Sequence, residues 1–439
     1  MSWKNDYDTK LCSVKEAVQH IKSGDTVCIG VAQATPTQLC ESLTARKGEL
    51  EGVRIIHTCN ATMGFDWHQE ESKDAFQVCS MFRTIFDRLH GDRVDYLPVG
   101  FSMFDRLGHD EGRKNNVDVF MTRVSPPNKH GYLSLGETVW LSKTYAKRAK
   151  LVIGEVTQGV IKVHGDARFH VSEFDFLVER QTPAQRKTKE EIANIMGERA
   201  EKIEVIGANI SDLVRDGDTI QLGTGDIGYA AAAFLRHKND LGMHTEILGP
   251  EVLGLVREGV LTGKYKTLHP KKVVATSFSL LTITDEDFDF IDSNPAFELY
   301  DVSYVNNPMI IAQNNNMVAI NNAMAIDLTG QIAAETLGTK MWSGTGGQLD
   351  FTIGAWMSQG GRVVVALPST ALDDKVSRIV PRLEAGDVVT IPRTLVDYVV
   401  TEYGYVNLAG RTRRERAHEL ISIAHPDFRS ELTQEAKKL

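Results

Sequence analysis

The sequence predicts an α/β fold made of two tandem related open α/β domains with mostly parallel sheets. The first reason is an internal duplication: residues 23–30 recur at 216–223, with a constant offset of 193 residues and a shared Gly-Asp-Thr core. The second reason is the order of elements around each copy, in which a strand, a glycine-containing loop, a helix and a second strand follow one another. Strand–helix–strand order needs a crossover, which pairs the strands in parallel and packs helices on the sheet.

The same elements are expected in the same order in both copies. Each opens with the end of an amphipathic helix that has a basic residue in its last turn and closes at a Gly-Asp turn. In the first copy the helix end, the loop-following helix and the second strand are expected at 17–22, 36–43 and 53–57. In the second copy they are expected at 210–215, 229–235 and 243–248.

Further elements follow the second copy. Alternating apolar residues predict strands, and a glycine turn at 327–330 predicts a hairpin-like pair. These strands are expected at 317–326, 331–335, 363–367, 388–391 and 396–400. A last amphipathic helix is expected at 414–424, where His425 and Pro426 stop it.

A polar stretch at 181–189 without apolar periodicity separates the two copies. We therefore expect one domain at 1–185 and a second at 190–439. A chain of 439 residues is too long for one core and suits this division.

Composition excludes several classes of protein. The net charge of −9 argues against a nucleic-acid-binding protein, which needs Lys and Arg to neutralise phosphates. No apolar run is long enough to span a membrane, and residues 1–10 lack the apolar core of a signal peptide. The five cysteines all lie before residue 80 and include no Cys-x-x-Cys pair, which predicts free thiols. We expect a cytoplasmic protein.

The glycine loop of the second copy is the first candidate for chemistry. Residues 223–228 read GTGDIG directly after a strand and before an Ala-rich helix. Small residues there let backbone N–H groups approach an anionic ligand at the start of a helix. Together with an acidic residue on the next strand, the pattern satisfies much of the dinucleotide fingerprint, so an NAD-dependent oxidoreductase is one hypothesis.

Glu246 is the second candidate. It is followed by two apolar residues and lies toward the end of the second strand, where open α/β sheets bind ligands. A second glycine-rich loop, Ser343 to Phe351, has three glycines within four residues and is typical of a nest for an oxyanion or of a tight turn.

Other clusters give weaker predictions. Glu155 and Glu173 border apolar segments and are interpreted as surface residues at strand ends. The sequence predicts no metal site, because neither of two His-containing groups has zinc-ligand spacing. These groups are His164, Asp166 and His170, and His57, Cys59 and His68.

The motifs together resemble class I coenzyme A transferases, in the acetyl-CoA hydrolase/transferase group that includes 4-hydroxybutyrate and butyryl-CoA:acetate CoA-transferases. The resemblance rests on the segments around 221–227, 242–246 and 344–351, and also covers 124–132, 399–404 and 423–429, nearly the whole chain. Each motif alone is unspecific, whereas the combination is specific.

The resemblance implies an acyl-CoA:carboxylate CoA-transferase that moves CoA between short-chain acids such as acetate, butyrate or 4-hydroxybutyrate. It implies a ping-pong mechanism through a glutamyl-CoA thioester on Glu246, with CoA and acyl-CoA as substrates and no tightly bound cofactor. The residues that it places at the CoA site are Gly223, Thr224, Gly225, Asp226, Ile227, Ile320, Gly344 and Gly347.

Two points stay open at the level of the sequence. An acyl-CoA hydrolase would share the same site and differ only in admitting water. Gln33 and Thr35, which follow the strand of the first copy, are candidates for contact with the carboxylate substrate. The resemblance also implies a homodimer or higher homo-oligomer.

Overall fold

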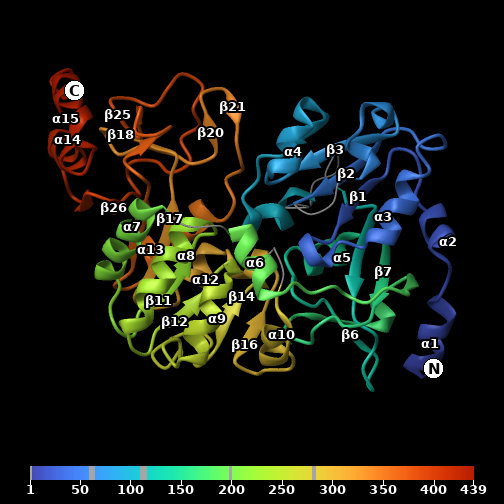
Figure 1. Cartoon of the computed structure of the whole chain (residues 1–439). Coiled ribbons are helices and arrows are strands. Elements are labelled where there is room, and N and C mark those ends of the chain that lie inside the picture. The colour runs from blue at the N-terminus through green and yellow to red at the C-terminus, as the bar shows by residue number, and fades with distance from the viewer. Residues whose placement is uncertain (1, 59–64, 109–115, 197–199, 279–282) are drawn as a thin grey trace. The chain divides into compact units, whose positions relative to one another are not determined.

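The computed structural model describes residues 2–58, 65–108, 116–196, 200–278 and 283–439, and the chain divides into two compact units. Unit 1 comprises Met1–Ile195 and Val274–Tyr304, and unit 2 comprises Met196–Val273 and Val305–Leu439 (Figure 1). The predicted domain boundary between 185 and 190 stays a prediction.

Unit 1 is built on a seven-stranded sheet in which every neighbouring pair of strands is parallel. The duplicated strand lies at its centre, because its four residues are all buried and pair on both sides. In order across the sheet the strands are β10 (Phe176–Arg180), β7 (Leu151–Thr157), β5 (Val119–Val124), β1 (Thr26–Ile29), β2 (Val53–His57), β3 (Phe76–Ser80) and β4 (Val94–Tyr96).

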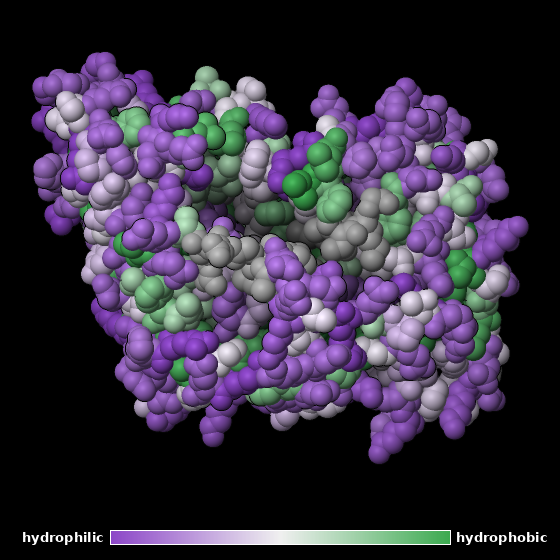
Figure 2. Space-filling view, in the orientation of Figure 1, coloured by the Kyte–Doolittle hydropathy of each residue, from purple (hydrophilic) through white to green (hydrophobic). Residues whose placement is uncertain are grey.

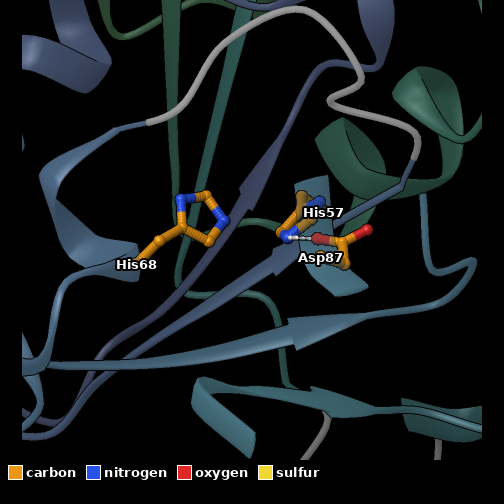
Figure 3. Close-up of side chains that lie close together, drawn as sticks. All are labelled: His57, His68 and Asp87. Carbon is orange, nitrogen blue, oxygen red and sulfur yellow. Dashed lines mark ion pairs between the residues drawn. The ribbon is translucent and has the colours of Figure 1, made fainter. Parts of the chain in front are cut away.

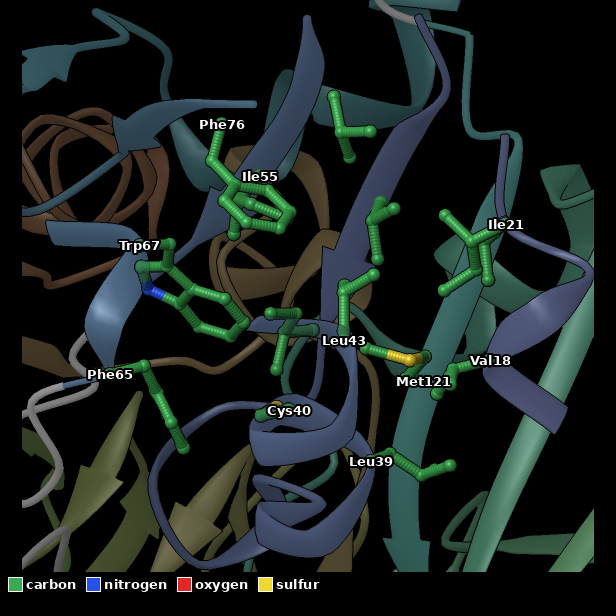
Figure 4. Packing of buried hydrophobic residues seen from close by; sticks show 14 of the residues in the cluster. Val18, Ile21, Leu39, Cys40, Leu43, Ile55, Phe65, Trp67, Phe76 and Met121 are labelled. Carbon is green, nitrogen blue, oxygen red and sulfur yellow. The ribbon is translucent and has the colours of Figure 1, made fainter. Parts of the chain in front are cut away.

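Helices α2 (Val14–Gln19) and α3 (Thr37–Thr44) pack on this sheet through a continuous apolar core (Figure 4). Val18 from α2 and Leu39, Cys40 and Leu43 from α3 are all 0% exposed. They meet apolar side chains from the strands, as a helix–sheet layer requires. The other residues labelled in the same cluster are Ile21, Ile55, Phe65, Trp67, Phe76 and Met121.

Unit 2 repeats this plan around β11 (Thr219–Leu222), which begins 193 residues after β1. Its strands lie in the order β27 (Gly404–Asn407), β26 (Tyr398–Thr401), β22 (Arg362–Ala366), β17 (Met317–Asn322), β11 and β12 (Gly242–His244). All these pairs are parallel except the hairpin β26–β27. The predicted α/β fold class with mostly parallel sheets is therefore confirmed.

The two units contain further helices and strands. Unit 1 also contains α1 (Trp3–Lys10), α4 (Ile85–Leu89), α5 (Ser142–Arg148), α10 (Asp285–Ile291), β6 (Tyr132–Ser134), β8 (His164–Gly165), β9 (Arg168–His170), β15 (Ser277–Phe278) and β16 (Phe297–Leu299). Unit 2 also contains α7 (Glu201–Leu213), α8 (Asp226–Phe234), α9 (Pro250–Arg257), α12 (Pro308–Ile311), α13 (Gln348–Met357), α14 (Arg413–Ser422), α15 (Pro426–Ala436), β13 (Ile247–Leu248), β18 (Ala325–Asp327), β19 (Ile332–Ala333), β20 (Thr336–Leu337), β21 (Lys340–Met341), β23 (Thr370–Ala371), β24 (Val376–Ser377) and β25 (Ile379–Val380). Helices α6 (Lys189–Met196) and α11 (Val302–Val305) and strand β14 (Val273–Ala275) lie where the chain passes between the units. Short 3-10 helices include η1 (Ala32–Ala34), η2 (Asp66–His68) and η6 (Val171–Glu173).

Four predicted elements differ from the structure. The strand predicted at 317–326 is two strands, β17 and β18, which belong to different sheets. Residues 388–391 form no strand; Ile391 makes a single bridge to Ile332, and Val388 and Val389 are exposed. The second strand of the second copy is interrupted between β12 and β13, so Glu246 lies outside both. Pro426 does not end the helical region but begins α15, because proline fits the first turn of a helix, where the missing N–H is not needed.

The surface and the thiols agree with the composition. On the face in Figure 2, hydrophilic residues cover most of the surface. No helix in the described part of the chain is both long and apolar enough to cross a bilayer. Cys12, Cys28, Cys40 and Cys79 are free thiols, and Cys59 lies outside the described residues.

Candidate active site

The predicted glycine loop of the second copy leads from β11 into α8, and its backbone conformation requires glycine. Gly225 is the residue before α8 and has φ 112 and ψ 177, a region that side-chain-bearing residues almost never adopt. A Cβ on Gly228 would overlap the carbonyl oxygen of Gly223. The loop therefore folds tightly back on itself at the start of a helix.

The amino terminus of α8 follows a residue that cannot cap it, because Gly225 has no side chain. Free N–H groups and the helix dipole at such an end favour an anion or a polar ligand chain. A small pocket lies beside the loop and is lined by Leu222, Gly223, Thr224, Gly228, Tyr229, Ala232, Ile247, Gly249, Glu251 and Val252.

Glu246 lies next to this loop's strand, in the break between β12 and β13, and its side chain is partly exposed. Its Oε2 accepts a hydrogen bond from Asn306 Nδ2 at 2.5 Å. Gly347 closes the same side, since an added Cβ there would overlap both Glu246 Oε2 and Asn306 Nδ2. An amide donor and a residue without a side chain thus fix the position of one carboxylate oxygen.

The surroundings raise the pKa of Glu246 to about 7. Desolvation is the main cause, and the negative charge of Asp350 adds to it, whereas the hydrogen bond from Asn306 opposes the shift. The carboxylate is therefore more basic than an ordinary glutamate, and a more basic carboxylate is a stronger nucleophile. Perturbed groups of this kind concentrate at functional sites.

His244, two residues before Glu246, plays a supporting part. It is 0% exposed, and its Nε2 lies 2.8 Å from the carbonyl oxygen of Val305, the residue before Asn306. Burial lowers the pKa of His244 to about 3, so the ring is neutral and donates to that carbonyl. The contact joins the end of β12 to the segment that carries Asn306.

The second glycine loop also leads into a helix. Gly347 is the residue before α13 and has no side chain to cap this helix start. Gln348 Nε2 donates to the carbonyl oxygen of Asn322 at 3.0 Å, and Asn322 Nδ2 donates to the carbonyl oxygen of Thr224 at 3.1 Å. The end of β17 therefore links the two glycine loops.

The structure brings the residues predicted for CoA into one unit, in three places. Gly223, Thr224 and Gly225 form the first loop, and Asp226 and Ile227 the first turn of α8. Ile320 lies on β17, where its carbonyl oxygen accepts from Gly223 N at 2.8 Å, so its backbone supports the loop. Gly344 and Gly347 belong to the second loop. Their binding of CoA stays a prediction.

Asn306 is the site residue that the sequence did not reveal. It is 0% exposed and lies 60 residues after Glu246. It comes directly after Val305, where the chain re-enters unit 2. No glycine pattern or strand periodicity marks it. The only sequence signal is its place before Asn307-Pro308, which start α12.

In the first copy, a buried carboxylate caps the start of the helix that follows the corresponding loop. Glu155 on β7 is 0% exposed, and its Oε2 accepts hydrogen bonds from Gln38 N at 2.9 Å and Leu39 N at 3.2 Å in the first turn of α3. The interpretation of Glu155 as a surface residue is therefore wrong, because β7 is covered on both faces. Glu173 caps η6 through His170 N.

The other predicted groups have separate contacts. Gln33 Oε1 accepts from Thr138 Oγ1 at 3.3 Å, and Thr35 Oγ1 donates to the carbonyl oxygen of Gly30. Asp166 pairs with Lys143, and His164 Nε2 lies 3.0 Å from the carbonyl oxygen of Ser293. A substrate contact by Gln33 or Thr35 stays a prediction.

Comparisons with known proteins place this architecture in a family. Residues 1–184 match the acetyl-CoA hydrolase/transferase N-terminal domain, and residues 284–436 match the acetyl-CoA hydrolase/transferase C-terminal domain. Residues 185–283, which include Glu246, lie between the two matched stretches.

Relatives match the whole chain. The chain is 40% identical to 4-hydroxybutyrate coenzyme A transferase of Clostridium kluyveri, covering 100% of both chains. It is 38% identical to succinyl-CoA:cyclohexane-1-carboxylate CoA transferase of Geobacter metallireducens, covering 100% of this chain and 97% of the relative. The crystal structure of RipA from Yersinia pestis superposes with a TM-score of 0.90 at 37% identity, over 100% of this chain and 99% of the other. The chain therefore belongs to the acetyl-CoA hydrolase/transferase family, and it is an enzyme of the CoA-transferase type.

Proposed function

We propose that the chain transfers CoA from a short-chain acyl-CoA to a carboxylic acid, with Glu246 as the covalent carrier. The observation that supports it most is the partly exposed Glu246 carboxylate, with a pKa raised to about 7 and an amide donor on Oε2. The family supplies the reaction class. The relatives act on different acids by name, so the family alone does not choose the acid.

The first half-reaction uses the free oxygen of Glu246. This oxygen attacks the thioester carbonyl, the C–S bond breaks, and CoA leaves as a thiolate, which gives a mixed anhydride of Glu246 with the acyl group. The thiolate then attacks Cδ of Glu246. The first acid leaves as a carboxylate, and a glutamyl-CoA thioester remains.

Asn306 fits the second of these steps. When the thiolate adds to Cδ, negative charge develops on the oxygen that is not part of the anhydride bridge. Asn306 Nδ2 already donates to Oε2, and so stabilises that charge as it forms. One preorganised donor of this kind is worth about 10²–10³ in rate.

The second half-reaction reverses the first with a new acid. Its carboxylate attacks the glutamyl-CoA carbonyl, thiolate is released and attacks the new anhydride at the acyl carbon, and Glu246 leaves as a carboxylate. Thioester energy is conserved only while water is kept away from both intermediates. We expect acids of the acetate, butyrate or 4-hydroxybutyrate type and a homo-oligomer from the family resemblance, and a cytoplasmic location from the cysteine usage and the amino-terminal sequence.

The pH dependence follows from the raised pKa of Glu246. The carboxylate is the attacking form, so kcat/KM for acyl-CoA should rise with pH and level off above about 7, near the pKa of the free enzyme. A steady-state profile between pH 5 and 9 measures this. A plateau that extends down to pH 5 would show that the side chain ionises as an ordinary glutamate.

Trapping the intermediate tests the proposal directly. The protein is incubated with acetyl-CoA in the absence of an acceptor acid, and peptide mass spectrometry should find CoA attached to Glu246. Glu246→Gln should lose the adduct and at least about 10⁴-fold of the transfer rate, as removal of a nucleophile does. The matched control is Glu258→Gln in the same unit, an exposed glutamate paired with Arg236.

The outcomes separate the hypotheses. An adduct on another residue, or transfer retained by Glu246→Gln, would refute the role of Glu246. Release of free CoA as fast as transfer to an added acid would make the enzyme a hydrolase on the same site. Stabilisation by NAD rather than by CoA in a melting experiment would favour the oxidoreductase hypothesis.

A further inference from the structure

Three buried side chains of metal-ligand type lie together in unit 1 (Figure 3). His57 is the last residue of β2, His68 ends η2, and Asp87 lies in α4, which follows β3. One nitrogen or carboxylate oxygen from each lies within 4.8 Å of the other two, and all three residues are at most 2% exposed. Because β2 and β3 are parallel neighbours, their carboxyl ends meet at one edge of the sheet, where α/β folds bind ligands.

We propose that His57, His68 and Asp87 bind one divalent transition-metal ion of the zinc class. Two imidazole nitrogens and one carboxylate oxygen, with a fourth position for water, form a three-ligand set that proteins use for Zn²⁺ and related ions. His57 Nε2 and Asp87 Oδ1 lie 3.4 Å apart. Two ligands on a tetrahedral ion with bonds of about 2.0 Å lie roughly 3.3 Å apart, so this pair already has the required spacing.

Hydrogen bonds around the cluster select the atoms that face the ion. Asp87 Oδ2 accepts from Thr84 N at 2.7 Å, from Thr84 Oγ1 at 3.2 Å and from Ser80 Oγ at 3.3 Å, which leaves Oδ1 toward His57. His68 Nδ1 lies 3.1 Å from the carbonyl oxygen of Phe65 and so carries the proton. Such outer contacts fix the orientation and tautomer of metal-binding residues.

Within the described part of the chain, three ring nitrogens of this cluster have no hydrogen-bond partner. His57 Nδ1, His57 Nε2 and His68 Nε2 are buried without a hydrogen bond among the described residues, and the 3.4 Å approach of His57 to Asp87 lacks hydrogen-bond geometry. Buried polar atoms are seldom left unpaired. Burial lowers the pKa of both imidazoles, that of His68 to about 4, so both rings are neutral and offer lone pairs.

The three ligands come from elements that sequence spacing does not join. Asp87 lies 30 residues after His57, and no zinc motif has this pattern, which is why the sequence predicted no metal site. The bound ion ties β2, η2 and α4 together at the sheet edge by coordination alone, without a redox step.

Metal binding by the full-length protein tests the proposal. After treatment with a chelator and dialysis, calorimetric titration with Zn²⁺ should show one ion per chain, and Zn²⁺ should raise the Tm. Co²⁺ in the same site should give the visible absorption bands of a four-coordinate nitrogen and oxygen site. His68→Gln should lower the affinity by at least about 100-fold.

The matched control is His90→Gln, because His90 stacks on His68 with ring centroids 5.0 Å apart but is not one of the three ligands. Its affinity for Zn²⁺ should equal that of the parent protein. Failure of the parent protein to bind Zn²⁺, or equal binding by His68→Gln, would overturn the proposal and leave a buried imidazole–carboxylate contact. Should His68→Gln not fold, Asp87→Asn serves as the second variant and the parent titration still decides.

Discussion

The two duplicated segments share their backbone plan but end in opposite states at the start of their helices. In unit 1, β1 leads to α3, whose first amides are taken by the buried carboxylate of Glu155. In unit 2, β11 leads to α8, whose N-cap residue Gly225 has no side chain to cap the helix. The same positive helix end is thus used for folding in one copy and is available for a ligand in the other.

The difference comes from residues outside the repeat. Glu155 reaches α3 from β7, and Asn306 reaches Glu246 from the segment before α12. The second strands show the same contrast, because β2 ends in His57 of the proposed metal site and β12 is followed by Glu246. The duplicated backbone therefore does not determine the chemistry of each copy. Single side chains from other segments, which lie at the edge of each sheet, determine it.

The backbone of the two loops preserves the duplication more closely than their side chains do. Ala32 and Gly225 lie 193 residues apart, and both have positive φ, 49 and 112. Alanine tolerates the left-handed region of the first value at a cost, whereas ψ 177 with the second value is accessible to glycine alone. The loop of the second copy therefore has the stricter requirement for glycine.

Among the variants that test the difference between the two copies, Asn306→Ala should have the largest effect on the transfer rate. It removes the donor to Glu246 Oε2, and kcat for transfer should fall by about 10²–10³-fold. Because this hydrogen bond lowers the pKa of Glu246, its loss should also move the pH midpoint of kcat/KM upward.

Asn315→Ala is the control for this variant, since Asn315 is exposed in the same unit. A lower rate with an unchanged pH midpoint would mean that Asn306 acts only by supporting the fold.

A smaller effect should follow from Gly225→Ala. The substitution strains the loop by about 1–3 kcal/mol, and dissociation constants for CoA should rise roughly tenfold in a calorimetric titration. The reciprocal variant Ala32→Gly should leave CoA binding unchanged, because its loop lies in unit 1, where Glu155 caps the start of the following helix. Equal losses in both variants would contradict the difference between the copies.

The smallest effect on function should come from Glu155→Gln. It weakens the cap on α3 and the contact with Arg180, so the free energy of unfolding should drop by about 1–3 kcal/mol in denaturant titration. Transfer kinetics should not change. Glu41→Gln, an exposed residue of α3, should cost almost nothing, and an altered KM for acyl-CoA in Glu155→Gln would show that unit 1 takes part in binding.

Local chemistry explains which elements the sequence could predict. The Gly-Asp turns and the apolar runs after them predicted β1 and β11, and the glycine turn predicted the β18–β19 hairpin, in which Gly330 has φ 94. Residues 388–391 have the same apolar pattern, yet no partner strand lies beside Val388 and Val389 among the described residues. An apolar sequence pattern alone does not determine whether a segment has a neighbouring strand to pair with.

The candidate site was predictable only where it is local. The glycine loops and Glu246 carry signals within a few residues. Asn306, Glu155 and Asp87 act on groups that are far away in the chain, so their roles depend on strand order and on the burial that it creates. Burial also sets the pKa of Glu246, which composition cannot give.

Gly347 leaves room for a hydrogen atom, and for nothing larger, on its side of the carboxylate. An acyl group must then arrive from the opposite direction, whichever acid it comes from. Both acids of the proposed reaction then approach the carboxylate from the same side, so the first has to leave before the second can bind. The contact between Gly347 and Glu246 thus imposes a strict alternation of the two acids on the proposed reaction.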